Sequence, residues 1–263
     1  MRRRKVCLSI GISFMVFCGA VLSCVTDKAP LQQNENIVPQ SEIAYYNDSF
    51  DKMREDLWDR AGYLHKEEQM QNFKQADMRF DNGKLIIRTK TGSFSKGGLG
   101  AKYALRGDFD IQLDCRIDFL KGASGMEQLL YILVIDKSGE IGKANTVLIN
   151  LTMGDGLHQG WLKSRGFING SWENSSAKNM ENFDGALRIL RKGKEISTLY
   201  KKKGVSAWST MHTFRATDKD MMFGFQLSNY FVNRTVIRAK HSISAEFDNF
   251  RINAVQEIIE EEI

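Results

Sequence analysis

The sequence FDIQLDCRIDF, at residues 109–119, alternates apolar and polar side chains with a period of two. Successive side chains of a β-strand point to opposite faces, so this pattern predicts a strand with one buried and one exposed face. Its aspartates, Asp110, Asp114 and Asp118, are expected on the solvated face. Cys115 falls on the apolar side, and we expect a buried structural thiol there, because free cysteines are among the most buried residues.

Strand patterns continue along the chain on both sides of this segment. They lie at residues 84–89, 129–135, 146–153, 186–191, 196–201, 222–227 and 245–252. Glycine turns separate several of them, and residues 92–100 (GSFSKGGLG) are predicted to form a hairpin loop. Many strands and little helix predict an all-β fold, a jelly-roll β-sandwich of two antiparallel sheets.

The first 24 residues have the organisation of a secretory signal. Residues 2–5 are positively charged and residues 6–22 are apolar, and this run is shorter than the roughly 20 residues that a spanning helix needs. The sequence VLSC at residues 21–24 resembles the bacterial lipobox. The resemblance implies cleavage before Cys24 and acylation of its sulfur, which would anchor the protein in a membrane. An ordinary signal with a chance cysteine is the alternative.

These features predict four segments. Residues 1–23 are the lipoprotein signal peptide, and residues 24–42, which contain both prolines, are a flexible tether from the lipidated Cys24. Residues 43–254 are one β-sandwich domain, and residues 255–263 are an acidic tail, either a short frayed helix or without ordered structure. The predicted location is the cell envelope, outside the cytoplasm. In a cell with an outer membrane that membrane is favoured, because Val25 and Thr26, and no aspartate, come directly after Cys24.

Charge and cysteine content exclude two classes of protein. The chain has a formal net charge of +5, and four of its cations (residues 2–5) lie in the signal, which leaves +5 − 4 = +1 for the rest. This balance predicts no nucleic-acid partner. Cys7 and Cys18 leave with the signal and Cys24 is acylated, so no intrachain disulfide can form with Cys115.

Several segments resemble the concanavalin A-like lectin and glucanase superfamily in their order along the chain. They are LWDRAGY at residues 57–63, FDNGKLII at 80–87, GDFD at 107–110 and FDNFRI at 247–252. The nearest enzymes of the superfamily are the laminarinase-type and lichenase-type glycoside hydrolases, and the strand pair at residues 187–200 is similar to that of laminin-G-like domains. The resemblance covers residues 44–253 and implies a concanavalin A-like jelly roll.

The resemblance also implies where a catalytic strand would lie. In these glucanases a strand with the pattern E-x-D-x-E supplies the nucleophile and the acid/base, as carboxyls about 5–5.5 Å apart. The matching strand, residues 145–153 (NTVLINLTM), has no carboxylate. We therefore expect no glucanase activity. A divergent hydrolase or lyase that uses other acids, such as Glu127, Asp155 or Glu173, stays open.

A structural Ca²⁺ is a further implication of the resemblance. Many relatives bind calcium through two backbone carbonyls and one aspartate of the last strand, and these positions fall on Ser49, Gly83 and Asp248. Carboxylate and carbonyl oxygens are the ligands that Ca²⁺ prefers. The alternative is that Asp248 only caps a turn or accepts a backbone hydrogen bond.

The segment HQGWLKSRGFINGSWEN, residues 158–174, has the kinds of side chain that bind sugars. Aromatic rings stack on the apolar faces of sugars, while amides and other polar groups bind the hydroxyls. The candidate ligand-binding residues, expected in the concave groove, are Trp161, Trp172, Phe167, Arg165, Asn150 and Tyr131. The alternative is that the two tryptophans pack under a hairpin.

These observations predict a lipid-anchored envelope protein whose sandwich domain binds carbohydrate without catalysis. The expected partners are a polysaccharide or cell-surface glycan and the membrane that holds the acylated Cys24. One alternative is the divergent hydrolase or lyase acting on a polysaccharide. The other is a structural or interaction lipoprotein with no sugar ligand.

Overall fold

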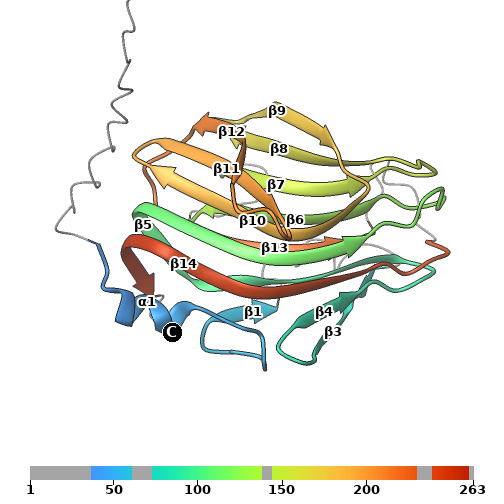
Figure 1. Cartoon of the computed structure of the whole chain (residues 1–263), viewed down its shortest axis with the longest axis horizontal. Helices are drawn as coiled ribbons and strands as arrows, with labels where there is room; N and C mark the ends of the chain where they lie inside the picture. Colours follow the sequence, from blue (N-terminus) through green and yellow to red (C-terminus); the bar gives the residue numbers. More distant parts are fainter. Residues whose placement is uncertain (1–36, 61–72, 138–143, 230–238, 261–263) are drawn as a thin grey trace, which may run out of the picture. The chain divides into compact units, whose positions relative to one another are not determined.

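The part of the chain that carries the fold is described by a computed structural model (Figure 1). The described residues are 37–60, 73–137, 144–229 and 239–260. They belong to the second of two compact units of the chain, Glu35–Ile263. The predicted signal peptide and Cys24 lie outside the described residues. Within the described part, no helix is long and apolar enough to span a bilayer.

The described residues of this unit form one short helix and fourteen strands, most of which are labelled in Figure 1. The helix is α1 (Gln40–Tyr46). The strands are β1 (Trp58–Arg60), β2 (Phe73–Gln75), β3 (Asp77–Phe80), β4 (Leu85–Arg88), β5 (Phe94–Asp118), β6 (Gln128–Asp136), β7 (Thr146–Met153), β8 (Gly160–Ile168), β9 (Ser171–Asn179), β10 (Asn182–Lys192), β11 (Glu195–Lys202), β12 (Ser209–Arg215), β13 (Met221–Ser228) and β14 (Ser244–Glu260).

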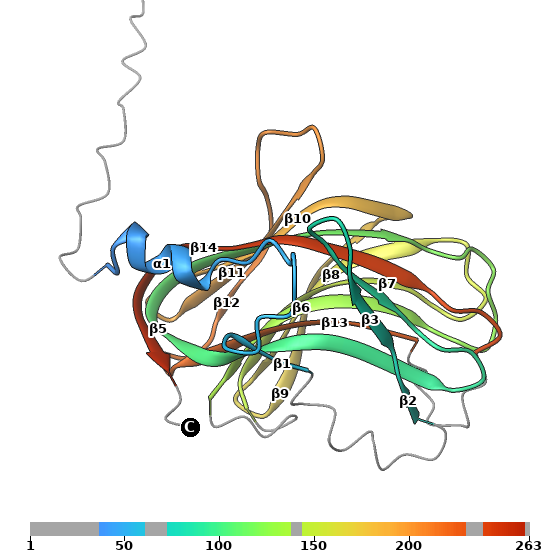
Figure 2. The same ribbon diagram turned by 90° about the horizontal axis from the view of Figure 1, so that it is seen from below.

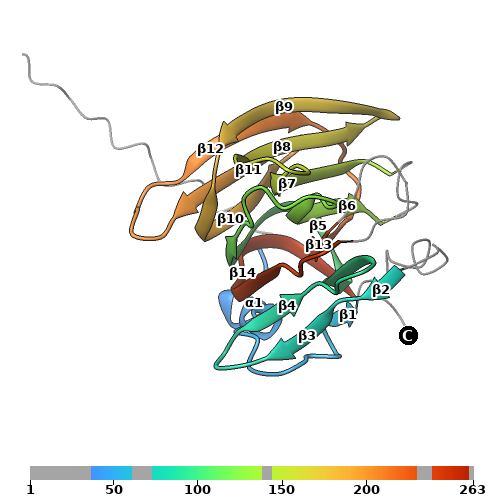
Figure 3. The same ribbon diagram turned by 90° about the vertical axis from the view of Figure 1, so that its right-hand side faces the viewer.

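The 25-residue strand β5 decides how these strands are organised, because its two halves belong to different layers. Its first half pairs with β13 between Lys96 and Leu105, and its second half pairs with β10 between Phe109 and Asp118. Gly107 lies between the halves with a φ of +70°, a left-handed conformation that glycine adopts readily. All fourteen strands therefore form one hydrogen-bonded network that folds into two layers (Figures 2 and 3).

We call the two layers A and B. Layer A is the first half of β5 with β1 and β2 beside it, followed by β13, β6, β7, β8 and β9. Layer B is β3, β4, β14, the second half of β5, β10, β11 and β12. Ser164 of β8 and Thr198 of β11 share a hydrogen bond of 2.5 Å between the layers. Gly166 of β8 leaves room for Phe214 of β12, because a Cβ there would lie 2.7 Å from the ring. The predicted β-sandwich is confirmed.

Alternation places one side of each strand in the core between the layers. In β5, Ile111, Leu113 and Ile117 are buried there, and Cys115 lies among them with only 4 % of its surface exposed. Burial raises the pKa of the Cys115 thiol, which keeps it protonated and unreactive. Both the predicted strand and the predicted buried cysteine, which forms no disulfide with any described residue, are confirmed.

The opposite side of this strand is less solvated than the sequence predicts. Asp110 is only 8 % exposed, and both of its carboxylate oxygens accept hydrogen bonds from the guanidinium of Arg188. Asp114 is half-buried and accepts a hydrogen bond of 3.2 Å from Asn249. The prediction was wrong for these aspartates because β10 and β14 flank β5 on both sides, and their side chains cover it.

The glycine-rich segment at residues 92–100 is also different from the prediction, since most of it is strand rather than hairpin loop. Gly98 pairs with Gln226 of β13, and a Cβ on Gly98 would lie 2.1 Å from the carbonyl oxygen of Phe225. Glycine is needed here so that two backbones can approach closely, which is a role within strands as well as turns.

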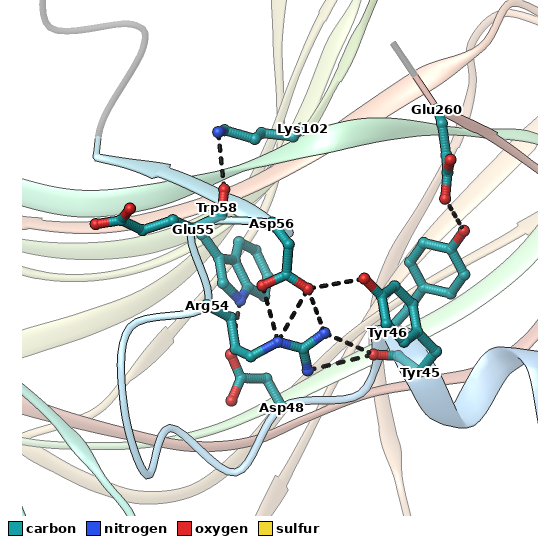
Figure 4. Close-up of polar contacts among 9 residues, drawn as sticks. All are labelled: Tyr45, Tyr46, Asp48, Arg54, Glu55, Asp56, Trp58, Lys102 and Glu260. Carbon is teal, nitrogen blue, oxygen red and sulfur yellow. Dashed lines mark hydrogen bonds and ion pairs between the residues drawn. The ribbon is translucent and has the colours of Figure 1, made fainter. Parts of the chain in front are cut away.

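The predicted acidic tail is likewise part of the sheet as far as Glu260. β14 continues to this residue and pairs with Tyr103 of β5. The hydroxyl of Tyr46 in α1 donates a hydrogen bond of 2.6 Å to the Glu260 carboxylate (Figure 4). The expectation of a frayed helix or no order was wrong for residues 255–260. Apolar Val255 is buried in the core, and this burial extends β14 beyond the predicted end of the domain.

The segment between α1 and β1 is held by a buried carboxylate, Asp48 (Figure 4). Its two oxygens accept hydrogen bonds of 2.7 Å each, from the Trp58 indole and from the backbone N–H of Phe50. Trp58 in turn packs against Phe250 of β14 with ring centroids 5.0 Å apart. Burial raises the pKa of Asp48, while the two hydrogen bonds lower it. This cluster ties the beginning of the domain to its last strand.

Candidate functional site

The outer face of layer A, which points away from layer B, is the candidate site. In β7 the side chains of Val147, Ile149 and Leu151 are fully buried in the core. The residues between them therefore point to the other side of the sheet, and Asn150 and Thr152 are among them. This is the strand that the sequence matched to the catalytic strand of the glucanases.

Strand register aligns this face into three rows that cross β13, β6, β7 and β8. The rows are Ser228, Leu129, Thr152, Trp161; then Gln226, Tyr131, Asn150, Lys163; then Gly224, Leu133, Leu148, Arg165. Side chains directly opposite each other on antiparallel strands have Cβ atoms about 4.5–5.5 Å apart. Residues distant in the sequence therefore form one continuous surface.

Three side chains in these rows carry polar atoms that the fold leaves unsatisfied. Asn150, Gln226 and Ser228 are 4 %, 2 % and 1 % exposed. The Asn150 Oδ1, Gln226 Oε1 and Ser228 Oγ atoms have no hydrogen-bond partner among the described residues. Each such group costs about 1–3 kcal/mol, and native proteins rarely leave several together without a reason. A bound molecule with hydroxyl groups would satisfy all three.

Glycines of β5 and β13 lie beside these polar groups. Gly98 pairs with Gln226, and Gly100 pairs with Gly224, so three adjacent positions have no side chain. At Gly98 the missing side chain lets the two strands approach closely, because a Cβ there would lie 2.1 Å from the Phe225 carbonyl oxygen and 2.6 Å from the Gln226 Cβ.

Aromatic side chains lie at the opposite end of the face, on β8 and β9. Trp161 is half-buried beside Thr152, and Trp172 is 50 % exposed. Phe167 contacts Trp172 with ring centroids 5.4 Å apart, and the Arg165 guanidinium lies 4.6 Å from the Trp172 ring centroid. Neither tryptophan belongs to the hydrophobic core.

All six candidate binding residues are brought to this one face by the fold. Tyr131 and Asn150 are adjacent in the middle row, Trp161 and Arg165 lie on β8, and Phe167 pairs with Trp172 beyond the third row. Sequence reasoning missed three residues of the rows, Lys163, Gln226 and Ser228. The signal for the last two was present in FGFQLS at residues 223–228, where polar residues alternate with large apolar ones.

Carboxylates are absent from the twelve row positions, all of which are described. Glu127 lies at the edge of the face and accepts a hydrogen bond of 3.0 Å from the Thr152 hydroxyl. Asp155 follows β7 and accepts a hydrogen bond of 2.6 Å from the Gly125 backbone N–H. Glu173 is exposed on β9. The twelve described row positions therefore supply no pair of acids that could flank a bound sugar.

The predicted calcium residues lie at the other side of the domain. The Ser49 carbonyl oxygen would lie 3.8 Å from a Cβ on Gly83, and the Asp51 carboxylate would lie 3.2 Å from it. Asp248 acts electrostatically on Lys84, the residue after Gly83. Asp248 also accepts a hydrogen bond of 2.7 Å from the Asn249 backbone. No group of three or more acidic, histidine or cysteine side chains converges among the described residues, so a cation here would rely on carbonyl oxygens.

Several solved structures have the same fold. A β-glucanase of Bacillus licheniformis superimposes with a TM-score of 0.52 at 13 % identity, covering 79 % of this chain and 96 % of the glucanase. LamA of Zobellia galactanivorans, in complex with laminaritriose and laminaritetraose, has a TM-score of 0.54 at 10 % identity, covering 83 % and 98 %. The CBM2 module of the evolved Dit of Lactobacillus casei BL23 phage J-1 has a TM-score of 0.51 at 10 % identity, covering 83 % and 96 %.

These likenesses establish the class of fold. The domain is a concanavalin A-like jelly roll, as the resemblance of its segments implied, and it shares this architecture with the glucanase and LamA structures. No protein-family model matches the chain, and no curated protein sequence matches it. At 10 % and 13 % identity the likeness shows the fold alone, because one fold serves many unrelated activities.

Proposed function

We propose that the protein is a lipid-anchored envelope protein whose jelly-roll domain binds a polysaccharide on the outer face of layer A without cleaving it. One observation carries the proposal. The face buries three polar groups without partners among the described residues, beside half-buried Trp161, in rows that contain no carboxylate. Binding is therefore favoured, and acid–base cleavage of a glycosidic bond is not.

Sugar hydroxyls suit this surface chemically. They can donate to Asn150 Oδ1 and Gln226 Oε1 and exchange hydrogen bonds with the Ser228 hydroxyl. The C–H face of a sugar ring can stack on Trp161 in the row that contains Ser228. Because LamA was solved with laminaritriose and laminaritetraose, laminarin is a reasonable first probe.

The proposal is tested by titrating the protein with a panel of soluble polysaccharides that includes laminarin. Asn150→Ala and Trp161→Ala should each weaken binding about 5- to 150-fold, since each removes an interaction of roughly 1–3 kcal/mol. Trp208→Ala is the matched control, because Trp208 lies beside Arg188 and Lys201 of layer B. Unchanged binding in both face variants would reject this surface.

The hydrolase alternative is tested in the same samples. Release of reducing sugar by the wild-type protein, lost in Glu127→Gln, would indicate an enzyme that uses the acid beside Thr152. If no polysaccharide in the panel binds or is cleaved, the result would contradict this proposal. It would favour the third alternative, a structural or interaction lipoprotein.

The membrane anchor is the second part of the proposal, and its support is the lipobox-like sequence at residues 21–24. Two or more acyl chains on one cysteine hold a protein stably at a bilayer. Cys24→Ser should therefore move the protein from the membrane fraction to the soluble fraction of the cell. Retention of the variant in the membrane fraction would contradict acylation at this position.

A structural Ca²⁺ is the third part, supported by the Ser49 carbonyl and the Asp51 carboxylate near Gly83 and by Asp248 beside Lys84. A bound ion stabilises the folded state in proportion to its affinity. The melting temperature should rise on adding CaCl₂ and fall with a chelator, and Asp248→Asn should abolish the difference. Identical melting curves in calcium and in chelator would reject the site.

A further inference from the structure

The outer face of layer A carries charges of both signs. Among the described residues, Asp59 of β1 pairs with Lys102 of β5 at 3.5 Å, and Glu127 lies at the edge of the rows. Lys163 and Arg165 are two cations on the same face of β8. The chain beyond the signal has a formal charge of only +1, as calculated above from the sequence, so these two cations are a local feature of β8.

Lys163 is next to one of the unpartnered amides. It lies directly opposite Asn150 in the middle row, and it forms no ion pair among the described residues. Along β8 it lies between Trp161 and Arg165, and same-face residues of a strand are about 6.8 Å apart. β8 therefore presents an aromatic ring, an ammonium and a guanidinium in sequence along one line.

From this arrangement we infer that the ligand of the outer face is an anionic polysaccharide, and that Lys163 binds its acidic group while Asn150 and Gln226 bind its hydroxyls. The inference rests on the proposed function and narrows it from polysaccharides in general to acidic ones. The acidic group is a uronate carboxylate or a sulfate ester, since an ammonium pairs with either.

An anionic polysaccharide should bind more tightly than a neutral glucan, because the site is partly desolvated. Half-buried Lys163 holds its charge next to groups that are almost completely buried, where water screens charges less than at an open surface. An anionic sugar supplies a counter-charge there, whereas a neutral sugar supplies only hydroxyls. Binding of the anionic ligand should also weaken as salt is added, while binding of a neutral glucan should not.

The experiment compares three probes on the intact protein: laminarin, which is neutral, polygalacturonate, which carries carboxylates, and dextran sulfate. Wild type should bind one of the two polyanions at least tenfold more tightly than laminarin. Lys163→Gln should weaken that binding tenfold or more, and it should weaken any laminarin binding by a clearly smaller factor. The polyanion that responds to Lys163→Gln distinguishes a carboxylate from a sulfate.

Lys178→Gln is the matched control, because it removes the same charge from the neighbouring strand β9. The Lys178 ammonium lies 5.2 Å from the ring centroid of Tyr200 in β11, so it points toward layer B. An equal loss in both variants would show general attraction of polyanions and would overturn the role of Lys163.

The outcomes separate this inference from the function on which it rests. Laminarin binding as tight as that of both polyanions, and sensitive to Asn150→Ala, would overturn the acidic ligand and leave polysaccharide binding intact. Failure of every probe to bind would overturn both. Polyanion binding that is unchanged in Lys163→Gln would leave an acidic glycan without this recognition residue and would overturn the inference.

Discussion

At the scale of residues, the informative feature is a set of polar side chains that the fold buries but does not satisfy. Asn150 and Gln226 are as buried as core residues, yet their amide oxygens have no partner among the described residues. Gln128 shows how the same fold treats a structural amide. Its side chain accepts from and donates to the backbone of Leu120, with both hydrogen bonds at 2.8 Å.

This contrast predicts opposite effects of the same type of substitution. Asn150→Leu should raise the free energy of unfolding by about 1 kcal/mol, because it removes a buried unsatisfied group, while glycan binding falls. Gln128→Leu should lower the free energy of unfolding by about 1–3 kcal/mol, because it leaves the Leu120 backbone unpaired. Urea denaturation measures both. A destabilised Asn150→Leu protein would show that Asn150 has a structural role.

Sequence alone predicted which residue types would gather but not their hydrogen-bonding state. Trp161, Arg165 and Asn150 were identified because aromatic and amide side chains suit sugars, and β7 and β8 are consecutive strands. Whether an amide is satisfied depends on neighbours from other strands, and no local pattern in the sequence encodes that.

At the scale of elements, the pairing of β5 with β14 places two acids side by side on layer B. Asp114 lies opposite Asp248, and burial raises the pKa of Asp114 above 3.8. The hydrogen bond from Asn249 lowers this pKa, and the charge of Asp248 raises it. Because the folded-state pKa is above the unfolded one, the stability that Asp114 contributes is present at low pH. It is lost as the pH rises through the folded-state value.

Replacing Asp114 with a neutral residue should therefore raise the free energy of unfolding at neutral pH. In Asp114→Asn the amide oxygen can still accept from Asn249, and the buried charge is gone. The free energy of unfolding of the variant, relative to wild type, should increase as the pH is raised from about 4 to 7. Asp118→Asn is the control, because Asp118 is exposed and pairs with Arg116 at 3.0 Å. If the free energies of unfolding of Asp114→Asn and wild type differ by a constant amount across this pH range, the pKa of Asp114 is not raised by folding.

Another element-scale prediction concerns the close approach of β5 to β13. Gly98→Ala places a methyl group 2.1 Å from the Phe225 carbonyl oxygen, so the strands must separate. We expect destabilisation of at least about 1–3 kcal/mol, the usual effect of overpacking. Gly154→Ala is the matched control, since its Cβ meets only the end of the Leu157 side chain, at 2.9 Å. Equal melting temperatures for the two variants would contradict the close approach.

Strands with clear alternation were predictable, and the glycine-rich strand was not. FDIQLDCRIDF has the period of a half-buried strand, and it is one. GSFSKGGLG shows no alternation of apolar and polar side chains. Its glycines are there because they pair closely with the backbone of β13. The end of β14 was missed for a different reason. Its acidic composition suggested a solvated tail, although Val255 is buried in the core.

At the scale of the whole molecule, apolar packing joins the two layers, and a buried polar contact is among the described contacts between them. Ser164 and Thr198 share a hydrogen bond of 2.5 Å across the core, and both are almost completely buried. Removing one partner removes a buried hydrogen bond, which costs about 1–3 kcal/mol. Removing both hydroxyls should lower the free energy of unfolding by less than the sum of the two single losses.

A double-mutant cycle with Ser164→Ala and Thr198→Val measures this coupling by urea denaturation. We expect a coupling energy of about 1 kcal/mol or more, since the groups contact each other directly. The control cycle uses the exposed pair Ser197 and Thr213, which share a hydrogen bond of 2.7 Å within layer B. Additive effects at Ser164 and Thr198 would show that the contact does not hold the layers together.

The amino-acid sequence by itself determined the strands with alternating side chains, the buried Cys115, and the lack of acids in NTVLINLTM, because these are local properties. Only the tertiary structure decided that Gln226 of β13 lies beside Tyr131, Asn150 and Lys163 in one row. The reason is strand register. It is set by the pairing of segments that are distant in the chain, and each shift by one residue would turn every side chain to the opposite face.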